Sequence, residues 1–204
     1  MQKKLDYLER YWKKNTFRPL QEEVIDHYLK GKDSIVLLPT GGGKSVCYQL
    51  PALLYQGQTI VISPLVSLMQ DQINQLNKRG IKSMFFESIG SKNDLYRQLE
   101  NARNGNFKII YFSPERLTSN EFLNQIEKLP IKGIAIDEAH CISEWGHDFR
   151  PAFRLIKNLR PLFPQTPIMA LTATATPKVL KDISTSLGLI QPKIFSTSFE
   201  RKNI

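Results

Sequence analysis

The sequence has few cysteines and no long apolar run, and each absence limits what the protein can be. Its two cysteines, Cys47 and Cys141, lie far apart and outside any Cys-x-x-Cys motif. Neither a disulfide framework nor a zinc site is therefore indicated. No apolar run approaches the length of a membrane span, and residues 1–15 lack the apolar segment of a signal peptide. We therefore expect a cytoplasmic protein with no membrane partner.

Acidic residues are also few compared with basic ones. The 204 residues include 28 Lys and Arg against 19 Asp and Glu, which gives a net charge of +9. From residue 150 onward, nine basic residues stand against two acidic ones. Nucleic acid suits such a surface, because phosphates neutralised by cations release counterions. A solvated basic surface without such a partner is the alternative.

Short apolar runs alternate with helical patterns along a chain whose length suits one domain, 1–204. The runs predicted as strands are 35–38, 59–62, 84–86, 108–112, 133–136, 168–171 and 193–195. The helices predicted late in the chain are 93–103, 121–128, 152–162 and 178–187. This alternation predicts a mostly parallel, doubly wound α/β sheet with helices on both faces. Ligands bind such sheets at the carboxyl ends of the strands.

A glycine-rich segment follows the first predicted strand. It consists of Thr40, Gly41, Gly42, Gly43, Lys44 and Ser45. Backbone N–H groups and the dipole of the following helix make such a loop an anion cradle. Lys44 would reach the terminal phosphates of a nucleotide, and the Ser45 hydroxyl would hold Mg²⁺. The strict P-loop pattern also requires a glycine at position 38, where this sequence has Leu38. A glycine turn without a ligand is the alternative.

Carboxylates follow a later apolar strand, in the tetrad Asp137-Glu138-Ala139-His140. Asp137 would hold Mg²⁺ opposite Ser45, and Glu138 would orient or deprotonate an attacking water. Two ordinary polar residues at a strand end are the alternative. The Gln21 amide offers a donor and an acceptor that match adenine, with Arg18 in support. Most glutamines of surface helices are only solvated.

Residues 140–150 read His-Cys-Ile-Ser-Glu-Trp-Gly-His-Asp-Phe-Arg. This segment resembles the aromatic-rich loop of the RecQ family of superfamily 2 DNA helicases. Further segments resemble the family's adenine-recognition motif and motifs I, Ia, Ib, II and III, in the order 17–21, 39–45, 63–65, 111–117, 137–140 and 171–175. The Asp-Glu-Ala-His tetrad is shared with RNA helicases, which are a rival class. The Trp-Gly-His-Asp-Phe-Arg stretch is more specific and favours RecQ.

The resemblance implies that residues 1–204 form the first RecA-like P-loop domain of a helicase. It implies ATP and Mg²⁺ as cofactors, and 3′-to-5′ unwinding of DNA in repair and recombination by the complete enzyme in the cytosol or nucleoid. Residues 198–204 resemble the crossover to a second RecA-like domain with an arginine finger. That domain, together with zinc and winged-helix modules, is expected outside this chain. We therefore expect the isolated chain to be weakly active or inactive.

The resemblance also implies residues that contact single-stranded DNA or duplex junctions, or couple DNA to hydrolysis. They are Ser63, Pro64, Arg116, Trp145, His147, Phe149, Arg150, Thr172 and Thr174. The loop supplies aromatic faces for stacking and a cation for phosphates. It begins at His140, which the resemblance places with the catalytic residues. Core packing is the alternative for the two aromatic residues, and a cap or turn is the alternative for the threonines.

Two further features of the sequence bear on adenine binding and on ATP hydrolysis. Many RecQ proteins carry a Gly-aromatic pair where this chain has Lys13-Lys14, so stacking on adenine from this segment is not predicted. A DNA-binding regulatory domain that never hydrolyses ATP is an alternative function. The intact Lys44, Asp137 and Glu138 count against it.

Overall fold

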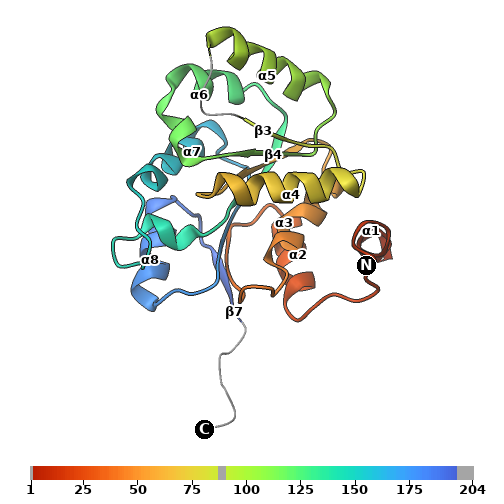
Figure 1. Ribbon diagram of the computed structural model, residues 1–204. Helices are drawn as coiled ribbons and strands as arrows, with labels where there is room; N and C mark the ends of the chain where they lie inside the picture. Colours follow the sequence, from red (N-terminus) through yellow and green to blue (C-terminus); the bar gives the residue numbers. More distant parts are fainter. Residues whose placement is uncertain (1, 87–90, 197–204) are drawn as a thin grey trace.

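The computed structural model describes residues 2–86 and 91–196 (Figure 1). Within them a parallel seven-stranded sheet has the order β3-β4-β2-β5-β6-β1-β7. The strands are β1 Ser34–Leu37, β2 Gln58–Ile62, β3 Ser83–Phe85, β4 Ile109–Phe112, β5 Ile131–Ile136, β6 Ile168–Thr172 and β7 Lys193–Ser196. The predicted parallel α/β sheet is therefore confirmed. The expected crossover at 198–204 lies outside the described residues.

Helices cover both faces of the sheet (Figure 1). The α-helices are α1 Gln2–Trp12, α2 Gln21–Leu29, α3 Lys44–Leu54, α4 Val66–Lys78, α5 Lys92–Asn104, α6 Asn120–Ile126, α7 Leu159–Leu162 and α8 Pro177–Ser186. The 3₁₀ helices are η1 Pro114–Thr118, η2 Ala139–Ile142 and η3 Pro151–Asn158. One apolar cluster joins α2, α3 and α4 to the sheet, and the other joins α5, α6, α7 and α8. No helix within the described residues is long and apolar enough to cross a membrane.

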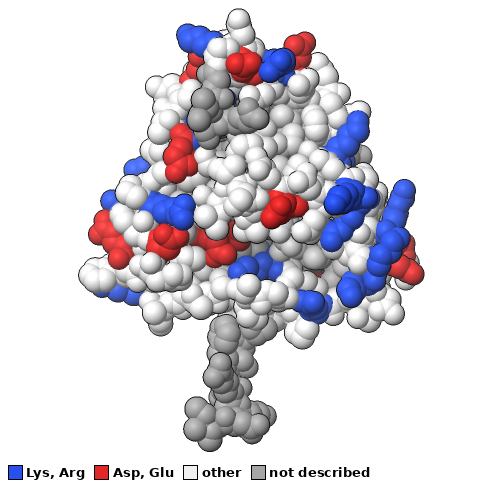
Figure 2. All heavy atoms as spheres, viewed as in Figure 1, with Lys and Arg blue, Asp and Glu red and all other residues white. Residues whose placement is uncertain are grey.

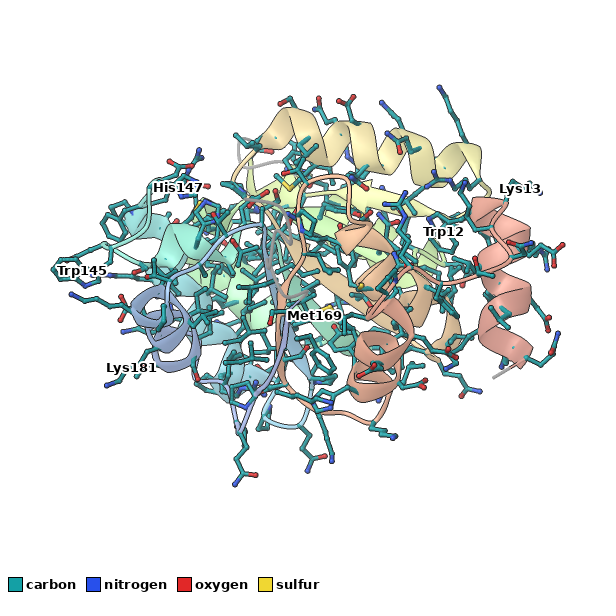
Figure 3. The ribbon with its side chains drawn as sticks, turned by 90° about the horizontal axis from the view of Figure 1, so that it is seen from below. Trp12, Lys13, Trp145, His147, Met169 and Lys181 are labelled. Atoms are coloured by element: carbon teal, nitrogen blue, oxygen red, sulfur yellow. The ribbon has the colours of Figure 1, made fainter. Side chains whose placement is uncertain are left out.

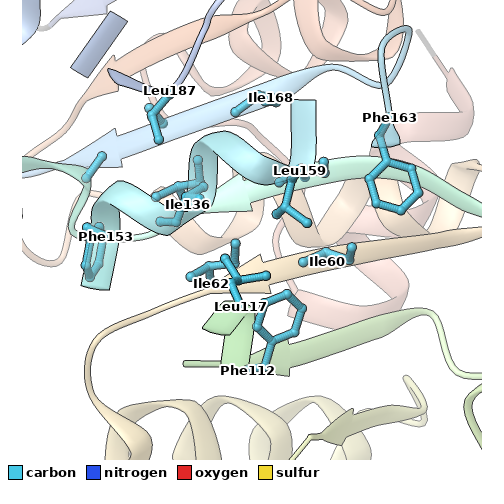
Figure 4. Packing of buried hydrophobic residues seen from close by; sticks show 14 of the residues in the cluster. Ile60, Ile62, Phe112, Leu117, Ile136, Phe153, Leu159, Phe163, Ile168 and Leu187 are labelled. Carbon is cyan, nitrogen blue, oxygen red and sulfur yellow. The ribbon is translucent and has the colours of Figure 1, made fainter. Parts of the chain in front are cut away.

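Successive strand residues enter opposite clusters, which explains why the strands read as continuous apolar runs. In β2, Ile60 and Ile62 join the α5–α8 side, whereas Val61 joins the α2–α4 side. Figure 4 shows Ile60 and Ile62 packed beside Phe112 and Ile136 of the neighbouring strands. A parallel sheet needs both faces covered. Each such side chain contributes about 1.5 to 3 kcal/mol through its burial.

The segment 152–162 is predicted as one α-helix, and this prediction is wrong. The chain forms a 3₁₀ helix over Pro151–Asn158 and a single α-helical turn over Leu159–Leu162. The 3₁₀ segment starts with a bond from Phe153 N to Arg150 O at 3.0 Å. Pro161 lies in the first turn of this α-helix, where its missing N–H needs no partner. In one helix over 152–162 it would lie in the interior and leave the carbonyl of residue 157 unpaired. Apolar periodicity alone does not distinguish the two helix types.

Asp33, the residue before β1, joins three segments at the amino-terminal edge of the sheet. Its Oδ1 accepts from Ile168 N at 2.8 Å, and its Oδ2 accepts from Ile190 N at 2.7 Å. Arg160 Nη2 lies 2.6 Å from the same Oδ2. The Asp33 side chain is only 4% exposed, so solvent screens this pair little. These bonds hold β1 beside β6 and β7 and thereby position the loops at the opposite edge.

We expect Asp33→Ala to lower the free energy of unfolding by about 3 to 5 kcal/mol, because it leaves the half-buried Arg160 without its carboxylate partner and two amides without their acceptor. Urea denaturation followed by circular dichroism measures the change. Asp71→Ala, at an exposed position of α4, is the control and should change the free energy by less than about 0.5 kcal/mol. Equal effects of the two substitutions would contradict the role given to Asp33.

Candidate active site

The glycine loop lies between the end of β1 and the start of α3. Gly41 and Gly43 have φ angles of 77° and 83°, in the left-handed region that favours glycine. Gly42 N donates to Pro39 O at 2.8 Å and closes the turn. A Cβ atom on Gly43 would lie 2.3 Å from Gln21 Nε2. The backbone conformation therefore favours glycine at position 43, and a larger residue would also displace the Gln21 amide group.

The predicted adenine-reading residues lie against this loop. Gln21 is buried, its Oε1 accepts from Arg18 N at 2.8 Å, and its Nε2 donates to Gly43 O at 3.0 Å. The exposed Arg18 donates through Nη1 to Gly41 O. One hydrogen of the Gln21 amide group remains for another acceptor. The structure brings both residues to the glycine loop, and their contact with adenine stays a prediction.

The carboxylate pair lies at the same sheet edge, directly after β5. Lys44 Nζ is 4.0 Å from Glu138 Oε1, so the predicted lysine and carboxylate face each other. Glu138 has a φ of 49°, an uncommon conformation for a residue with a side chain. Its N–H donates to Asp137 Oδ1 at 3.0 Å. Such strain is typical of residues whose position serves a function.

A cavity of about 620 Å³ connects these groups. Its lining includes Lys44, Ser45 and Asp137 together with Trp12 and Phe17. This volume lies in the range of small-molecule sites. A hydroxyl and a carboxylate oxygen are ligands that Mg²⁺ prefers, and the lysine and the loop N–H groups suit phosphates. The residues present therefore fit a nucleotide triphosphate with its magnesium ion.

Burial governs the electrostatics of this edge. It raises the pKa of the Asp137 carboxyl to about 6, with Glu138 adding to the rise and Lys44 opposing it. Burial also lowers the pKa of His140, which favours the neutral imidazole. A charged Asp137 is therefore costly in the ligand-free chain, and a bound cation would offset that cost.

His140 connects the carboxylates to the end of β6. Its Nδ1 lies 2.9 Å from Thr172 Oγ1 and 3.3 Å from Glu138 Oε2. The Thr172 hydroxyl donates its hydrogen to Thr174 O at 3.0 Å. Nδ1 must therefore carry the proton in the hydrogen bond to Thr172. The geometry orients the Glu138 carboxylate through a buried imidazole.

The aromatic loop packs directly on this imidazole. The rings of His147 and His140 are stacked, with centroids 4.3 Å apart. Arg150 Nη1 donates to Pro64 O at 3.1 Å and so connects the loop to the segment after β2. Trp145 is 63% exposed and projects from the edge of the molecule (Figure 3), so core packing does not apply to it. Phe149 is partly buried beneath the Arg154 guanidinium.

Two predicted DNA-contacting residues, Ser63 and Arg116, are at least partly buried and lie outside the aromatic loop. Ser63 is 2% exposed at the end of β2, so its hydroxyl does not reach the surface. The Arg116 guanidinium lies over the Phe122 ring, 5.0 Å from its centroid, and its pKa is lowered by burial. Thr174, in contrast, lines a second cavity of about 510 Å³ together with Trp145.

The structure adds residues that the sequence does not indicate. Trp12, Lys14 and Arg79 also line the large cavity, and the Arg79 guanidinium lies 5.9 Å from the Trp12 ring centroid. Figure 2 shows basic side chains gathered over α1 and the end of α4. Helical periodicity predicts only that Arg79 is on a surface. The approach of α1 to α4 is a tertiary contact with no local sequence signal.

Three possible metal ligands cluster behind the loop. Ligand atoms of His140, Cys141 and Asp148 lie within 4.8 Å of one another. Asp148 already pairs with Arg150 at 3.1 Å, and burial raises the pKa of the Cys141 thiol to about 12. A protonated thiol and a neighbouring guanidinium both disfavour a bound cation. That this chain holds no zinc stays a prediction.

A parallel sheet with a glycine loop and a carboxylate pair at its carboxyl edge defines a RecA-like P-loop domain. The family model of DEAD/DEAH box helicases matches residues 18–183, and the chain belongs to this family.

Within this family, the chain is similar in sequence to helicases of the RecQ type. The chain is 46% identical over 200 residues to the ATP-dependent DNA helicase RecQ of Pasteurella multocida, and 45% identical over 199 residues to that of Bacillus subtilis. These alignments cover 98% and 97% of the chain but only 32% and 34% of the relatives. The resemblance to RecQ proteins is therefore confirmed, and the chain spans about a third of their length.

Solved structures support the fold alone. The helicase MrfA bound to DNA superposes with a TM-score of 0.74 at 19% identity, over 97% of this chain and 29% of that chain. The helicase domain of Hef from Pyrococcus furiosus gives 0.66 at 18% identity, over 89% of this chain and 39% of that chain.

We expect Asp137→Asn to stabilise the ligand-free chain at alkaline pH. Because the pKa of Asp137 is raised in the folded chain, its carboxyl group contributes fully to the unfolding free energy below the ordinary pKa of 3.8. This contribution is lost as the pH rises through about 6. Asparagine avoids that loss and still accepts from Glu138 N. The gain in unfolding free energy is about 1 to 3 kcal/mol near pH 8 and close to zero near pH 4.

Urea denaturation in EDTA measures this gain, with the exposed Asp71→Asn as the control. A gain that is as large at low pH as at high pH would contradict the burial of an ionised Asp137.

Proposed function

We propose that the chain is the ATP-binding domain of a RecQ-type DNA helicase, which couples ATP hydrolysis to movement along single-stranded DNA and to duplex unwinding. The observation that carries this proposal is the contact between Lys44 and Glu138 in a cavity of nucleotide size. The name of the relatives, ATP-dependent DNA helicase, supports the same activity.

Different residues of the cavity would contact the phosphates, the metal ion, the attacking water and the adenine of ATP. Lys44 lies beside Glu138 in the ligand-free chain and would contact the terminal phosphates when ATP binds. Glu138 would then be free to accept a proton from water. Ser45 and Asp137 would hold Mg²⁺, which when bound supplies positive charge against the phosphate oxygens. His140 and Thr172 keep the Glu138 carboxylate in position. Gln21 and Arg18 would read the adenine from the side of the loop.

DNA would act on this chemistry through short contacts. A base stacked on Trp145 and a phosphate at Arg150 would move the loop that carries His147. His147 stacks on His140, and His140 contacts Glu138. The path from His147 to the carboxylate thus consists of two direct contacts, both made by the His140 ring. Thr174, beside Trp145 in the second cavity, would connect the β6 end to the same loop.

A second RecA-like domain would complete the cavity. The cavity is lined by Lys44 and Glu138 at the carboxyl edge of the sheet, and in related enzymes an arginine supplied in cis or by a partner stabilises the transition state of phosphoryl transfer. We therefore propose a second RecA-like domain as the partner of this one. The isolated chain should bind nucleotide weakly and unwind little or no duplex.

Two substitutions test the proposal. Lys44→Ala should weaken binding of a fluorescent ATP analogue by at least about tenfold, because it removes the cation that faces the phosphates. Glu138→Gln should keep this binding but lower ATP hydrolysis by about 10²-fold or more. Binding is measured on the 204-residue chain, and hydrolysis on the chain joined to a second RecA-like domain, with and without single-stranded DNA.

Nucleotide binding that survives Lys44→Ala would contradict the proposed site. A wild-type protein that binds DNA but never hydrolyses ATP would favour the regulatory alternative.

We expect Arg150→Ala to uncouple hydrolysis from DNA. It removes the bond to Pro64 O and the pairing with Asp148 that hold the loop. Stimulation of the ATPase by single-stranded DNA should fall by about tenfold, while hydrolysis without DNA stays unchanged. Lys157→Ala, at an exposed position nearby, removes the same charge as a control. Stimulation that remains at the wild-type level would reject the coupling path.

A further inference from the structure

A cation lies against the exposed indole of the aromatic loop. Lys178 Nζ is 3.0 Å from the centroid of the Trp145 ring. Lys178 belongs to the first turn of α8, far from the loop in sequence. Trp145 is nevertheless 63% exposed, so a large part of the indole remains open to solvent. The lysine therefore holds the ring on one side without burying it.

The loop and α8 are also tied together by hydrogen bonds. Ser143 Oγ donates to Asp182 Oδ2 at 2.7 Å, and Trp145 N donates to Ser143 Oγ at 3.2 Å. Lys178 and Asp182 are four residues apart and share one face of α8. Two neighbouring side chains of this helix thus fix the backbone and the ring of the same loop residue.

The charge of Lys178 is not neutralised by a neighbour. Within residues 2–86 and 91–196, no carboxylate oxygen lies within 4.0 Å of its ammonium group. Arg154, the cation over the Phe149 ring, is instead paired with Glu144. Of the two cations that lie over aromatic rings of the loop, Lys178 is the one whose charge remains available to an anionic partner.

We propose that Lys178 is a positioning residue for single-stranded DNA. It fixes the Trp145 indole so that a base stacks on the open face, and it places a positive charge beside the neighbouring phosphate. A ring that is already held loses less conformational freedom when it binds. A cation on an aromatic face provides such a hold, and stacking on the ring is tolerant of base identity. The proposal rests on the proposed function, because it assumes that Trp145 meets DNA.

The matched pair Lys178→Met and Lys181→Met tests this role. Both lysines are on α8, both are exposed, and each substitution removes one charge. Figure 3 shows Lys181 on the same side of the molecule as Trp145. Only Lys178 has a ring contact among the described residues of this helix. Lys178→Arg, which keeps a cation for the ring, should restore wild-type behaviour.

The 204-residue chain has an apolar cluster on each face of its sheet, so both experiments use this chain without a second domain. It has two tryptophans, so a Trp12→Phe background leaves Trp145 as the only one. Without DNA, Lys178→Met should increase quenching of Trp145 fluorescence by acrylamide, and Lys181→Met should not. Affinity for an oligothymidylate should fall roughly fivefold for Lys178→Met and less than about twofold for Lys181→Met.

Equal losses of affinity in the two variants would show an effect of net charge only and would overturn the proposal. Unchanged quenching in Lys178→Met would also overturn it, because the lysine would then not hold the ring. A parent chain that binds no single-stranded DNA contradicts the proposed function instead. The quenching experiment needs no DNA, so it decides independently whether Lys178 positions the indole.

Discussion

The approach of Lys44 to Glu138 is the contact on which the site depends. The lysine follows the loop after β1, and the glutamate follows β5, with β6 between the two strands. Their meeting requires that all three strands run in parallel and end at one edge. A slip of one residue in either strand pairing would turn side chains to the opposite face and separate the two groups. The nucleotide cavity is thus a consequence of the sheet register.

The carboxyl edge of the sheet contains features that lower the stability of the ligand-free chain, and the rest of the domain offsets them. Desolvation raises the pKa of Asp137, and Glu138 has a left-handed backbone. Each feature reduces stability in the ligand-free chain. Two apolar clusters and the Asp33 network at the other edge hold the strands that carry them. Ligand binding would relieve part of the cost, which is typical of a site kept ready for a charged partner.

Much of this arrangement could be predicted from the sequence. Apolar runs located the strands, and the rule that ligands meet parallel sheets at the carboxyl edge brought Lys44 and Asp137 together. Periodicity was insufficient at 152–162, where a 3₁₀ helix precedes a single α-helical turn. It also gave no indication of the contacts from Lys178 to Trp145 or from Arg79 to Trp12. These contacts join segments distant in the chain, and no local pattern encodes them.

We infer that Lys44, Ser45 and the two carboxylates bind one triphosphate together with Mg²⁺. A structure of the chain with Mg²⁺ and a non-hydrolysable ATP analogue decides whether they do. In that structure the Lys44 ammonium should leave Glu138 for the phosphates, and Ser45 and Asp137 should lie around the metal. Phosphates bound elsewhere, or a Lys44 that stays beside Glu138 in the complex, would rule out this binding site.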